Sequence, residues 1–589
     1  MRRPAKFSPP PSTFSGTAFA VKELLQSGDI SRFNAMNHRQ NELRQDQESE
    51  TPLYKDRYPR LASSSMRKSI PEFLEDFQKQ GPSEEVMLTG RVRSKRVAGR
   101  SLIFLDIVNE FQKMQVMVNK SKCVSEEQRR LQKFALFRNL IQVGDHISVI
   151  GHATRTKAGE PTLEATQLPE LVSPCMEQVP EKLTDAKTRM TERHVDMLVN
   201  REVTDILRLR ANITKYMRDY FHSKRFLEFQ TPILAENAGG AVARPFVTRA
   251  TEFRNRDLAL RIAPELWLKR LVIGGVDRVF EIGPAFRNEG VDATHNPEFT
   301  MCEFYSAYTN LPDLVKETEE LLHGLAKHAQ ELISTQLTTL PPIDLGRFVR
   351  PFKQVEFIPG LEAATGIRFP KLSSEDALPE LLAVLKLAGI SVPGEVPDSL
   401  PKLLDRLAAV YLEPLSFTEP LFITHHPACM SPLAKAFVCP QTYQLVSARA
   451  ELFVGGRELA NMYEEENDPE EQQRKLSAHR SLVNEPNGEL GFANNLAQGQ
   501  EQMPGQEEPT PTEEAEPDEW DAPPLDQSYV KALDYGLPPT GGWGCGVERL
   551  VMLFSGANRI SDCLSFGTLR NVVGLSSEDK AVDKDMGSR

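Results

Sequence analysis

A glycine-rich segment near the carboxyl end of the chain restricts its possible folds more than any other feature. The segment is Gly541-Gly-Trp-Gly544-Cys-Gly546-Val-Glu548-Arg549-Leu-Val-Met-Leu. We predict a glycine-rich strand that leads into an apolar helix, with Arg549 in the first helical turn. Glycines in such a strand allow a flat ligand to approach the backbone closely. The arginine beside them can stack on that ligand or pair with a phosphate.

A second segment is predicted to form a strand, a charged loop and another strand. It contains Phe280-Glu-Ile-Gly-Pro-Ala-Phe-Arg287-Asn-Glu289-Gly and then Thr294-His295-Asn296-Pro297-Glu298-Phe299. An arginine at a strand end can place its guanidinium on a phosphate or a carboxylate. Taken alone, Arg-x-Glu is more typical of a salt-bridged hairpin. Together with the glycine-rich segment, it indicates a ligand site.

A third segment, Lys224-Arg-Phe-Leu-Glu-Phe-Gln-Thr231-Pro232-Ile-Leu, follows a predicted helix and ends in a proline-containing strand. In chain order, these three segments resemble motifs 1, 2 and 3 of class II aminoacyl-tRNA synthetases. The resemblance covers roughly residues 85 to 572. Five further runs narrow it to the lysyl-tRNA synthetases: Arg261-Ile-Ala-Pro-Glu265-Leu, Phe422-Ile-Thr-His-His-Pro, Met430-Ser-Pro-Leu-Ala-Lys435, Gly455-Gly-Arg-Glu458-Leu and Tyr535-Gly-Leu-Pro-Pro-Thr540.

The charge of the substrate offers an independent argument. Free lysine has one carboxylate and two ammonium groups, so its site should present one arginine and several carboxylates. Glu265, Glu303 and Glu465 fit this demand. The aspartyl and asparaginyl enzymes resemble Ser-Pro-Gln where this chain has Ala-Pro-Glu, which argues against them. Glu465 lies in a row of three acids that could also be a solvent-exposed face, and alignment within the resemblance selects it.

The resemblance implies the roles of the other site residues. The lysine substrate is contacted by Gly240, Glu265, Arg287, Glu303, Tyr305, Asn461, Tyr463 and Glu465. Of these, Glu265 and Glu303 face the α-ammonium, Glu465 and Tyr305 face the ε-ammonium, and Arg287 holds the reacting carboxylate. ATP is contacted by Arg287, Glu289, His295, Asn296, Phe299, Glu451, Glu458 and Arg549.

Catalysis is expected from positioning and electrostatics rather than from a nucleophilic side chain. Glu451 and Glu458 lie seven residues apart on a predicted hairpin. The resemblance implies that they hold Mg²⁺, which prefers carboxylate oxygens. Phe299 and Arg549 would sandwich adenine, Glu289 would contact its edge, and His295 would reach the outer phosphates. The expected catalytic residues are Arg287, Glu451, Glu458 and Arg549.

The hydrophobic pattern divides the 589 residues into regions. We expect a transit peptide and linker over residues 1–80, a barrel over 81–178, a catalytic domain over 179–577 and a tail over 578–589. Four short β-rich runs predict a five-stranded oligonucleotide-binding (OB) barrel, namely Val86 to Arg93, Leu102 to Ile107, Met114 to Val118 and His146 to Ile150. Four more predicted strands lie in the second domain, at Leu227 to Phe229, Asp277 to Ile282, Thr300 to Tyr308 and Ala450 to Val454.

The second domain has helical spacing from Asp196 to His222, and its strands show no regular βαβ alternation. We therefore predict an α+β fold with an antiparallel sheet and flanking helices. An acidic, proline-containing insertion over about 486–522 is expected to be disordered, because it cannot bury enough apolar surface.

The distribution of charge suggests a nucleic-acid partner for the barrel. The whole chain has a net charge of −12, but residues 86–175 carry more basic than acidic residues. Within that region the resemblance implies that Arg96, Phe104, Gln115 and Glu160 read the anticodon of tRNA(Lys). Aromatic platforms and edge hydrogen bonds are typical of single-strand recognition. The alternative for Phe104 is simple core packing.

The remaining expectations concern location and assembly. The first 22 residues contain basic and hydroxyl residues and no acid, as mitochondrial transit peptides do, although three prolines at 9–11 interrupt any helix. Ser565-Phe-Gly567-Thr-Leu-Arg570 also resembles fungal mitochondrial enzymes, and a cytoplasmic location is the alternative. Motif 1 implies a homodimer around Pro232.

Several classes of protein are disfavoured by the composition. No run approaches the roughly 18 apolar residues of a membrane span. Seven cysteines form no C-x-x-C pair, which argues against a zinc knuckle or a disulfide scaffold. Two functional alternatives stay open: a synthetase-like paralogue that binds tRNA without charging it, and an aspartyl- or asparaginyl-tRNA ligase.

Overall fold

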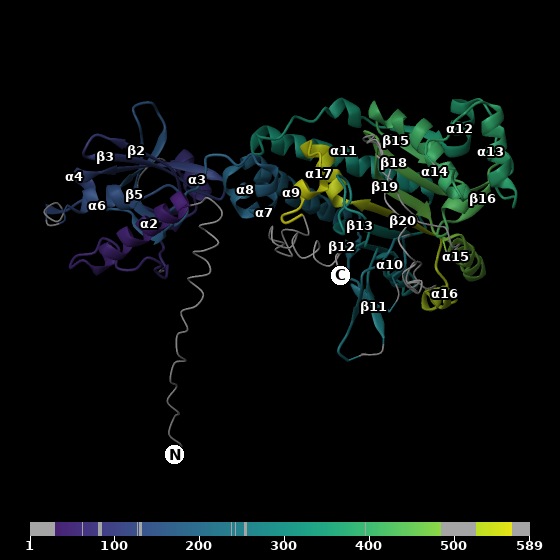
Figure 1. Ribbon diagram of the computed structural model, residues 1–589, viewed down its shortest axis with the longest axis horizontal. Helices are drawn as coiled ribbons and strands as arrows, with labels where there is room; N and C mark the ends of the chain where they lie inside the picture. Colours follow the sequence, from purple (N-terminus) through teal and green to yellow (C-terminus); the bar gives the residue numbers. More distant parts are fainter. Residues whose placement is uncertain are drawn as a thin grey trace, which may run out of the picture. The chain divides into compact units, whose positions relative to one another are not determined.

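The computed structural model describes residues 30–567, except residues 62, 81–84, 127, 129–131, 237, 242, 253–255, 395 and 484–525. The chain forms two compact units, Met1–Lys182 and Leu183–Arg589 (Figure 1). The expected boundary after residue 178 lies four positions before this division. The first 29 residues of the expected leader, the acidic insertion and the tail fall outside the described residues.

The first unit is built on a barrel of five strands. They are β2 Glu85–Ala98, β3 Leu102–Asn109, β4 Gln112–Asn119, β5 His146–Arg155 and β6 Pro161–Ala165. Neighbours pair in the order β2-β3-β4-β6-β5, and pairing of β2 with β5 closes the ring. Alternate residues such as Ile103, Leu105 and Ile107 are buried inside it, as strand geometry requires. The predicted five-stranded barrel is confirmed.

Helices and short strands surround this barrel. They are α2 Ile30–Glu48, β1 Arg67–Lys68, α3 Ile70–Gln80, α4 Lys120–Cys123, α6 Lys133–Leu140 and β7 Glu170–Ser173. Leu43, Ile70, Phe73 and Phe77 belong to the same hydrophobic core as the barrel strands. The prediction that residues 1–80 are only leader and linker is therefore wrong for residues 30–80.

The reason for this error is that α2 is held by charge as well as by apolar packing. Its Arg39 donates to Asp145 at 2.8 Å, and both side chains are buried. Asp145 lies in the loop before β5, more than a hundred residues away, so no local hydrophobic period marks the helix as part of the barrel unit.

The second unit contains an eight-stranded sheet in the order β14-β15-β18-β19-β20-β13-β12-β8. Its strands are β8 Leu227–Glu228, β12 Arg278–Phe286, β13 Glu298–Ala307, β14 Lys353–Glu356, β15 Leu421–Thr424, β18 Arg449–Val454, β19 Arg457–Glu464 and β20 Thr540–Gly546. Pairing is antiparallel except for β14 with β15 and β8 with β12. The α+β prediction is confirmed, and each of the four predicted strands is present.

The α-helices of this unit are α7 Ala186–Thr191, α8 Arg193–Val199, α9 Arg201–Ser223, α10 Glu265–Ile273, α11 Leu311–Thr335, α12 Phe357–Thr365, α13 Ala377–Leu387, α14 Leu400–Tyr411, α15 Pro469–Val483, α16 Gln527–Leu533 and α17 Val547–Ser555. The 3₁₀ segments are Leu345–Phe348, Glu413–Phe417, Ala428–Met430 and Ile560–Cys563. Smaller sheets contain β9 Leu234–Ala235, β10 Val247–Arg249, β11 Asp257–Leu260, β16 Ala436–Val438 and β17 Leu445–Ser447. The predicted helix over 196–222 is divided at Asn200 into α8 and α9.

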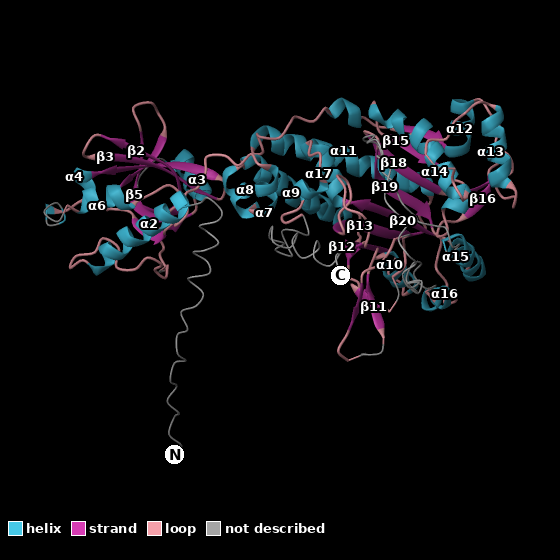
Figure 2. Cartoon of the chain, in the orientation of Figure 1, coloured by secondary structure: helices cyan, strands magenta, loops and turns pink. Residues whose placement is uncertain are grey.

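Strand alternation gives the large sheet two different faces. Cys302 and Phe304 of β13 and Trp543 of β20 pack with α9, α11 and α17 in one core. We call this the helical face, and Figure 2 shows these helices beside the strands. Glu303 and Tyr305 alternate with the core residues and therefore point to the opposite side, which we call the binding face.

Candidate active site

The register of the sheet aligns the expected site residues from separate strands. One row across the sheet runs Glu451, Asn461, Gly544 and Glu303, from β18, β19, β20 and β13. The next row on the same side contains Tyr463, Gly542 and Tyr305. Because neighbours in register share a face, these side chains gather on the binding face.

Glycines in β20 leave the space that this gathering needs. A Cβ atom at Gly542 would overlap Oε1 of Glu465 and would lie 2.6 Å from Cε1 of Tyr305. A Cβ at Gly544 would instead be at an ordinary 3.4 Å from Cγ of Glu303. On this face, Gly542 and Gly544 leave the floor of the pocket without side chains. Glu465 and Tyr305 occupy the space directly above Gly542.

Glu265 begins α10 and projects into the same region. Its Oε1 accepts hydrogen bonds from Tyr463 Oη at 2.8 Å and from Lys269 Nζ at 2.5 Å. Gly240 lies against it with a φ of +94°, and a Cβ there would be 2.8 Å from Cβ of Glu265. Both the conformation and the close approach favour glycine, which places Gly240 at the wall beside Glu265.

Each of the three consecutive acids at 464–466 has a different partner. Glu464 Oε1 accepts from the backbone N–H of Leu311 at 2.9 Å. Glu465 is 1% exposed and forms an ion pair with Lys269, whereas Glu466 is bound by Lys475 at 2.6 Å. The alternative of a solvent-exposed acidic face is therefore wrong, because Glu465 and Glu466 are buried.

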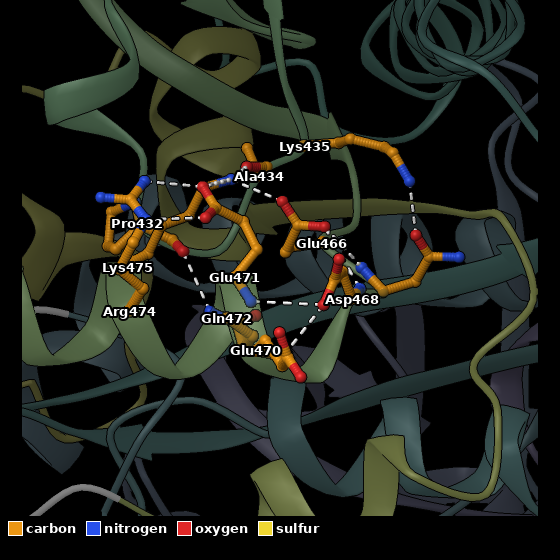
Figure 3. Close-up of polar contacts among 11 residues, drawn as sticks. Pro432, Ala434, Lys435, Glu466, Asp468, Glu470, Glu471, Gln472, Arg474 and Lys475 are labelled. Carbon is orange, nitrogen blue, oxygen red and sulfur yellow. Dashed lines mark hydrogen bonds and ion pairs between the residues drawn. The ribbon is translucent and has the colours of Figure 1, made fainter. Parts of the chain in front are cut away.

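Figure 3 shows the network that fixes this part of the chain. Lys475 of α15 binds both the Glu466 carboxylate and the Ala434 carbonyl, at 2.6 and 2.8 Å. Gln472, one turn earlier, donates to the Pro432 carbonyl at 3.0 Å. The backbone N–H of Glu465 also donates to Thr540 of β20 at 2.8 Å. These contacts fix the chain on both sides of Glu465.

The environment of Glu303 favours the neutral form of its carboxyl group. Burial, reinforced by the charge of Glu265, raises the pKa of Glu303 to about 8. Tyr305 Oη donates to it at 3.1 Å, and Arg287 and Lys269 oppose the increase. An arriving ammonium group would stabilise the ionised carboxylate.

Arg287 follows the end of β12, and its Cζ lies 5.2 Å from the centre of the Phe299 ring. Its Nε is buried and has no hydrogen-bond partner among the described residues. Burial lowers the pKa of Arg287, while the nearby charges of Glu289 and Glu458 raise it. A buried guanidinium with a free donor suits a carboxylate or phosphate oxygen.

The loop after Arg287 brings two further expected residues together. His295 Nδ1 bonds to Asp292 at 2.9 Å, and its Nε2 lies 3.4 Å from Arg549. Burial raises the pKa of Asp292, but hydrogen bonds from Thr294 and His295 outweigh this and lower it to about 2. Asp292 thus orients His295, a role that the sequence analysis did not assign. The sequence signal for this role was the presence of an acid, Asp292, three residues before His295.

The other expected nucleotide-binding residues have simpler surroundings. Asn296 donates to the Glu298 carbonyl at 2.6 Å, and Glu289 is exposed. Arg549, in the first turn of α17 as predicted, donates to the Glu458 carbonyl at 2.9 Å and lies 3.4 Å from its carboxylate. Phe299 packs with Arg287, and its pairing with Arg549 around adenine stays a prediction.

Glu451 and Glu458 lie on the β18–β19 hairpin, as predicted. Glu451 is bound by Arg449 and by His426, the latter at 3.1 Å. Burial raises the pKa of Glu451, but Arg449 and His426 outweigh it and bring the pKa to about 2. The carboxylate is therefore ionised at neutral pH. Arg449 and His426 support the site and were not singled out from the sequence.

The donor chemistry of this pair suits Mg²⁺, which prefers carboxylate oxygens and the oxygens of a bound nucleotide. Among the residues that the structure describes, no group of three or more His, Cys, Asp or Glu side chains could hold a metal. Glu451 and Glu458 could therefore contribute only part of a coordination shell, with the remainder from phosphate and water.

Two buried networks connect the motifs. Arg261 donates to Glu281 at 2.6 Å and to Thr231 at 2.9 Å, and Thr231 also donates to Glu281 at 2.7 Å. This joins the segment before Pro232 to β12. Arg210 of α9 donates to Glu548 at 2.9 Å, and Glu548 accepts from Thr300 N at 2.9 Å.

The expected anticodon residues lie on the barrel strands of the first unit. Arg96 is opposite Phe104, and its Cζ is 4.9 Å from the ring centre. Phe104 is half-buried between the fully buried Ile103 and Leu105, so it lies on the outside of the barrel rather than in its core. Gln115 donates to Glu160 at 3.2 Å, which joins β4 to the turn before β6.

Comparison with known proteins gives the class of the chain. The profile of class II tRNA synthetases (D, K and N) matches residues 185–570, and that of the OB-fold nucleic acid binding domain matches 86–171. The chain is therefore a class II aminoacyl-tRNA synthetase with an OB-fold domain. The three motifs, the antiparallel sheet and the barrel agree with this class.

Individual relatives narrow the class. The chain is 39% identical over 527 residues to the mitochondrial lysine–tRNA ligase of Schizosaccharomyces pombe. This alignment covers 87% of the present chain and 91% of the relative. It is 32% identical to the mitochondrial lysine–tRNA ligase of Saccharomyces cerevisiae, with 87% and 90% covered. A probable cytoplasmic lysine–tRNA ligase of Encephalitozoon cuniculi is 34% identical, with 85% and 91% covered. The chain belongs to the lysine–tRNA ligase family, which confirms the resemblance inferred from its motifs.

Within the described parts of the chain, none of the helices combines the length and apolar character needed to cross a bilayer.

Proposed function

We propose that this enzyme activates lysine with ATP on the binding face and then transfers it to the 3′ end of tRNA(Lys). The observation that carries the proposal is the convergence of Glu265, Glu303 and Glu465 beside Arg287. The three carboxylates match the two ammonium groups of lysine, and the guanidinium matches its carboxylate. In this arrangement the lysine carboxylate attacks the α-phosphorus of ATP, and pyrophosphate leaves. A terminal tRNA hydroxyl then attacks the carbonyl carbon of the lysyl-adenylate, which forms the ester and releases AMP.

The side chains would act by holding charges in place. Glu265 and Glu303 face the α-ammonium, and Glu465 with Tyr305 faces the ε-ammonium. Gly240, Asn461 and Tyr463 line the pocket. The free Nε of Arg287 supports its assignment to the reacting carboxylate and the α-phosphate. Fixed charges of this kind stabilise a phosphoryl transition state without reorganisation.

The ATP phosphates and base would occupy the region between the loop after Arg287 and the β18–β19 hairpin. Glu451 and Glu458 would hold Mg²⁺, which would neutralise phosphate charge. His295 and Asn296 lie in the loop suited to the outer phosphates, while Phe299, Arg549 and Glu289 are assigned to adenine. The hydrogen bond that His295 Nδ1 donates to Asp292 keeps the His295 ring in one orientation.

Lysine-dependent exchange of pyrophosphate into ATP tests the first step. Exchange with lysine but not with aspartate or asparagine is expected, and Glu465→Gln should raise KM for lysine with little change in KM for ATP. Absence of exchange would support a paralogue that binds tRNA without charging it. Exchange with aspartate or asparagine instead would support the other ligase specificity.

Recognition of tRNA is assigned to the outer surface of the barrel. Arg96 stacked on Phe104 offers an aromatic platform, and Gln115 with Glu160 offers edge hydrogen bonds. Phe104→Ala should raise KM for tRNA(Lys) at least about fivefold, since one base stack contributes about 1–3 kcal/mol. Lysine-dependent pyrophosphate exchange is the control and should not change.

We further propose a homodimer formed around motif 1. Leu227 and Leu234, on either side of Pro232, are 54% and 49% exposed, and Val247 is also exposed. Sedimentation should give twice the chain mass of 66.2 kDa. Leu234→Asp should shift the enzyme to monomer, whereas Leu387→Asp, which alters another exposed leucine on α13, should not. A fully active wild-type monomer would refute this assignment.

A mitochondrial location is proposed from the basic leader and from the mitochondrial relatives. Fusion of residues 1–40 to a fluorescent reporter tests it. Mitochondrial fluorescence is expected, and replacement of Arg2, Arg3 and Lys6 with glutamine should disperse it. A cytoplasmic signal from the unaltered fusion would favour the cytoplasmic alternative.

A further inference from the structure

A lysine of the protein itself lies among the carboxylates of the proposed lysine pocket. Lys269 is one turn after Glu265 on α10, and its side chain is 0% exposed. Its Nζ donates to Glu265 Oε1 at 2.5 Å and forms an ion pair with Glu465 Oε2. None of the roles implied by the resemblance uses this residue.

Aromatic rings complete the surroundings of this ammonium group. The Nζ of Lys269 lies 5.9, 5.7 and 5.8 Å from the ring centres of Tyr305, Tyr463 and Tyr529. These tyrosines come from β13, β19 and α16. Ring faces attract cations at such distances, so three separate elements form a cage for a positive charge.

Lys269 is charged in this environment. Burial lowers its pKa, but the charges of Glu265 and Glu465 outweigh burial and raise the pKa well above the ordinary value. The side chain therefore supplies one fixed positive charge to the pocket at every physiological pH.

The charges of the pocket then match those of one substrate molecule. Glu265, Glu303 and Glu465 supply three negative charges when ionised, and Lys269 and Arg287 supply two positive ones. With all three carboxylates ionised, the pocket therefore has one net negative charge, and Glu303 reaches this state by releasing its proton when lysine binds. Free lysine carries one net positive charge, so its binding gives a neutral buried assembly, which a low-dielectric site requires.

Glu465 is placed to serve both ammonium groups. Both of its carboxylate oxygens are buried and have no hydrogen-bond partner among the described residues, but Oε2 forms the ion pair with Lys269. Oε1 lies towards Gly542 and Tyr305, where the floor has no side chain. One oxygen is thus held by the protein, and the other is available to a ligand.

We propose that Lys269 is a positioning and specificity-determining residue, a built-in counter-ion that shares Glu465 with the substrate ammonium and sets the pocket charge for a monocationic amino acid. This rests on the proposed lysine pocket. Without Lys269, the buried carboxylates lose their counter-ion and must bind protons instead. The incoming lysine must then displace these protons, which weakens its binding.

Lys269→Met is the first test, since methionine keeps the unbranched chain up to the position of Cε and removes the ammonium group. KM for lysine in pyrophosphate exchange should rise at least about 30-fold, the low end of the effect of truncating one partner of a buried charge pair. KM for ATP should stay within about twofold of wild type. The matched control is Lys475→Met, which removes another buried ammonium (Figure 3).

The control separates a charge effect in the pocket from general loss of stability. Lys475→Met should lower the melting temperature, and any rise in its KM for lysine should not respond to added amines. In Lys269→Ala, ethylammonium should lower KM for lysine at least about fivefold by filling the vacated cage, by analogy with the coupling typical between two binding sites. Loss of function without amine rescue would show a purely structural role and would overturn the proposal.

A double variant tests the charge count directly and guards against misfolding of Lys269→Met. Lys269→Met with Glu265→Gln restores one net negative charge, so it should bind lysine more tightly than either single variant. Additive losses would overturn the proposal, as would an unchanged or lower KM for lysine in Lys269→Met. Failure of the unaltered enzyme to exchange pyrophosphate with lysine would instead refute the proposed function.

Discussion

Replacement of Gly542 by alanine tests whether the floor of the pocket must be free of side chains. The new Cβ would overlap Oε1 of Glu465 and would lie 2.6 Å from Tyr305 Cε1, well inside the 3.4 Å at which ordinary contact begins. Neither neighbour can easily move. Glu465 is held by its backbone bond to Thr540 and by Lys269, and Tyr305 is buried and bonded to Glu303.

The magnitude follows from what must change to fit one methyl group. Overpacking a rigid core costs about 1–3 kcal/mol. If the Glu465 carboxylate is displaced from Lys269 as well, the broken buried pair adds a loss of similar size. We therefore expect a destabilisation of about 3 kcal/mol and a rise in KM for lysine of about 30-fold or more, because 2 kcal/mol corresponds to about 30-fold in affinity.

Denaturant unfolding and pyrophosphate exchange measure the two effects. The matched control is Gly544→Ala in the same strand and on the same face, where the Cβ has an ordinary 3.4 Å contact with Glu303. It should change stability by less than about 1 kcal/mol and KM for lysine less than threefold. Wild-type stability and KM for lysine in Gly542→Ala would refute the inferred approach of Glu465 to β20.

Three further predictions concern other charges. Burial raises the pKa of Glu303 to about 8, so lysine must displace a proton from this carboxyl group below that pH. KM for lysine should therefore rise as the pH falls from about 8 to about 6, by up to about tenfold per pH unit. Glu303→Gln should remove most of this pH dependence. Arg287→Lys should lower kcat of adenylation about 100-fold in single-turnover assays, because an ammonium cannot replace the planar fork; a change confined to KM for lysine would contradict this role. Arg39→Met should destabilise the first unit by about 3 kcal/mol in denaturant unfolding, since it leaves Asp145 buried without its partner. The exposed pair Lys68–Asp76 is the control, where Lys68→Met should cost less than about 1 kcal/mol, and equal losses would contradict the buried pairing of Arg39.

Strand periodicity explains why several residues selected from the sequence for the candidate site share one face of the sheet. Glu303 is separated from Glu451 and Asn461 by a long stretch of chain, yet each of the three alternates with core residues of the helical face. The family resemblance selected these residues, and the period of two explains why they share one face. The hairpin of Glu451 and Glu458 and the position of Arg549 in the first turn of α17 were predicted from the local sequence.

The contacts that support the site could not be predicted in this way. Asp292, Arg449 and His426 act through hydrogen bonds that depend on the exact path of loops and on pairing between strands. The same applies to Arg39 and Asp145 in the first unit, which join segments a hundred residues apart. No local pattern in a single sequence carries this information.

Glu265 and Lys269 show how burial changes the meaning of a familiar pattern. A glutamate four residues before a lysine on a helix is ordinarily a solvent-exposed pair that contributes about 0.2–0.5 kcal/mol. Here α10 lies against the binding face, both side chains are buried, and the lysine also reaches Glu465. The spacing was visible in the sequence, but its importance depends on the third charge, which comes from a distant strand end. A buried charge whose partners lie on separate elements therefore has to be interpreted together with the charges of all those partners. In the proposed pocket, the positive charge of the lysine substrate balances their sum.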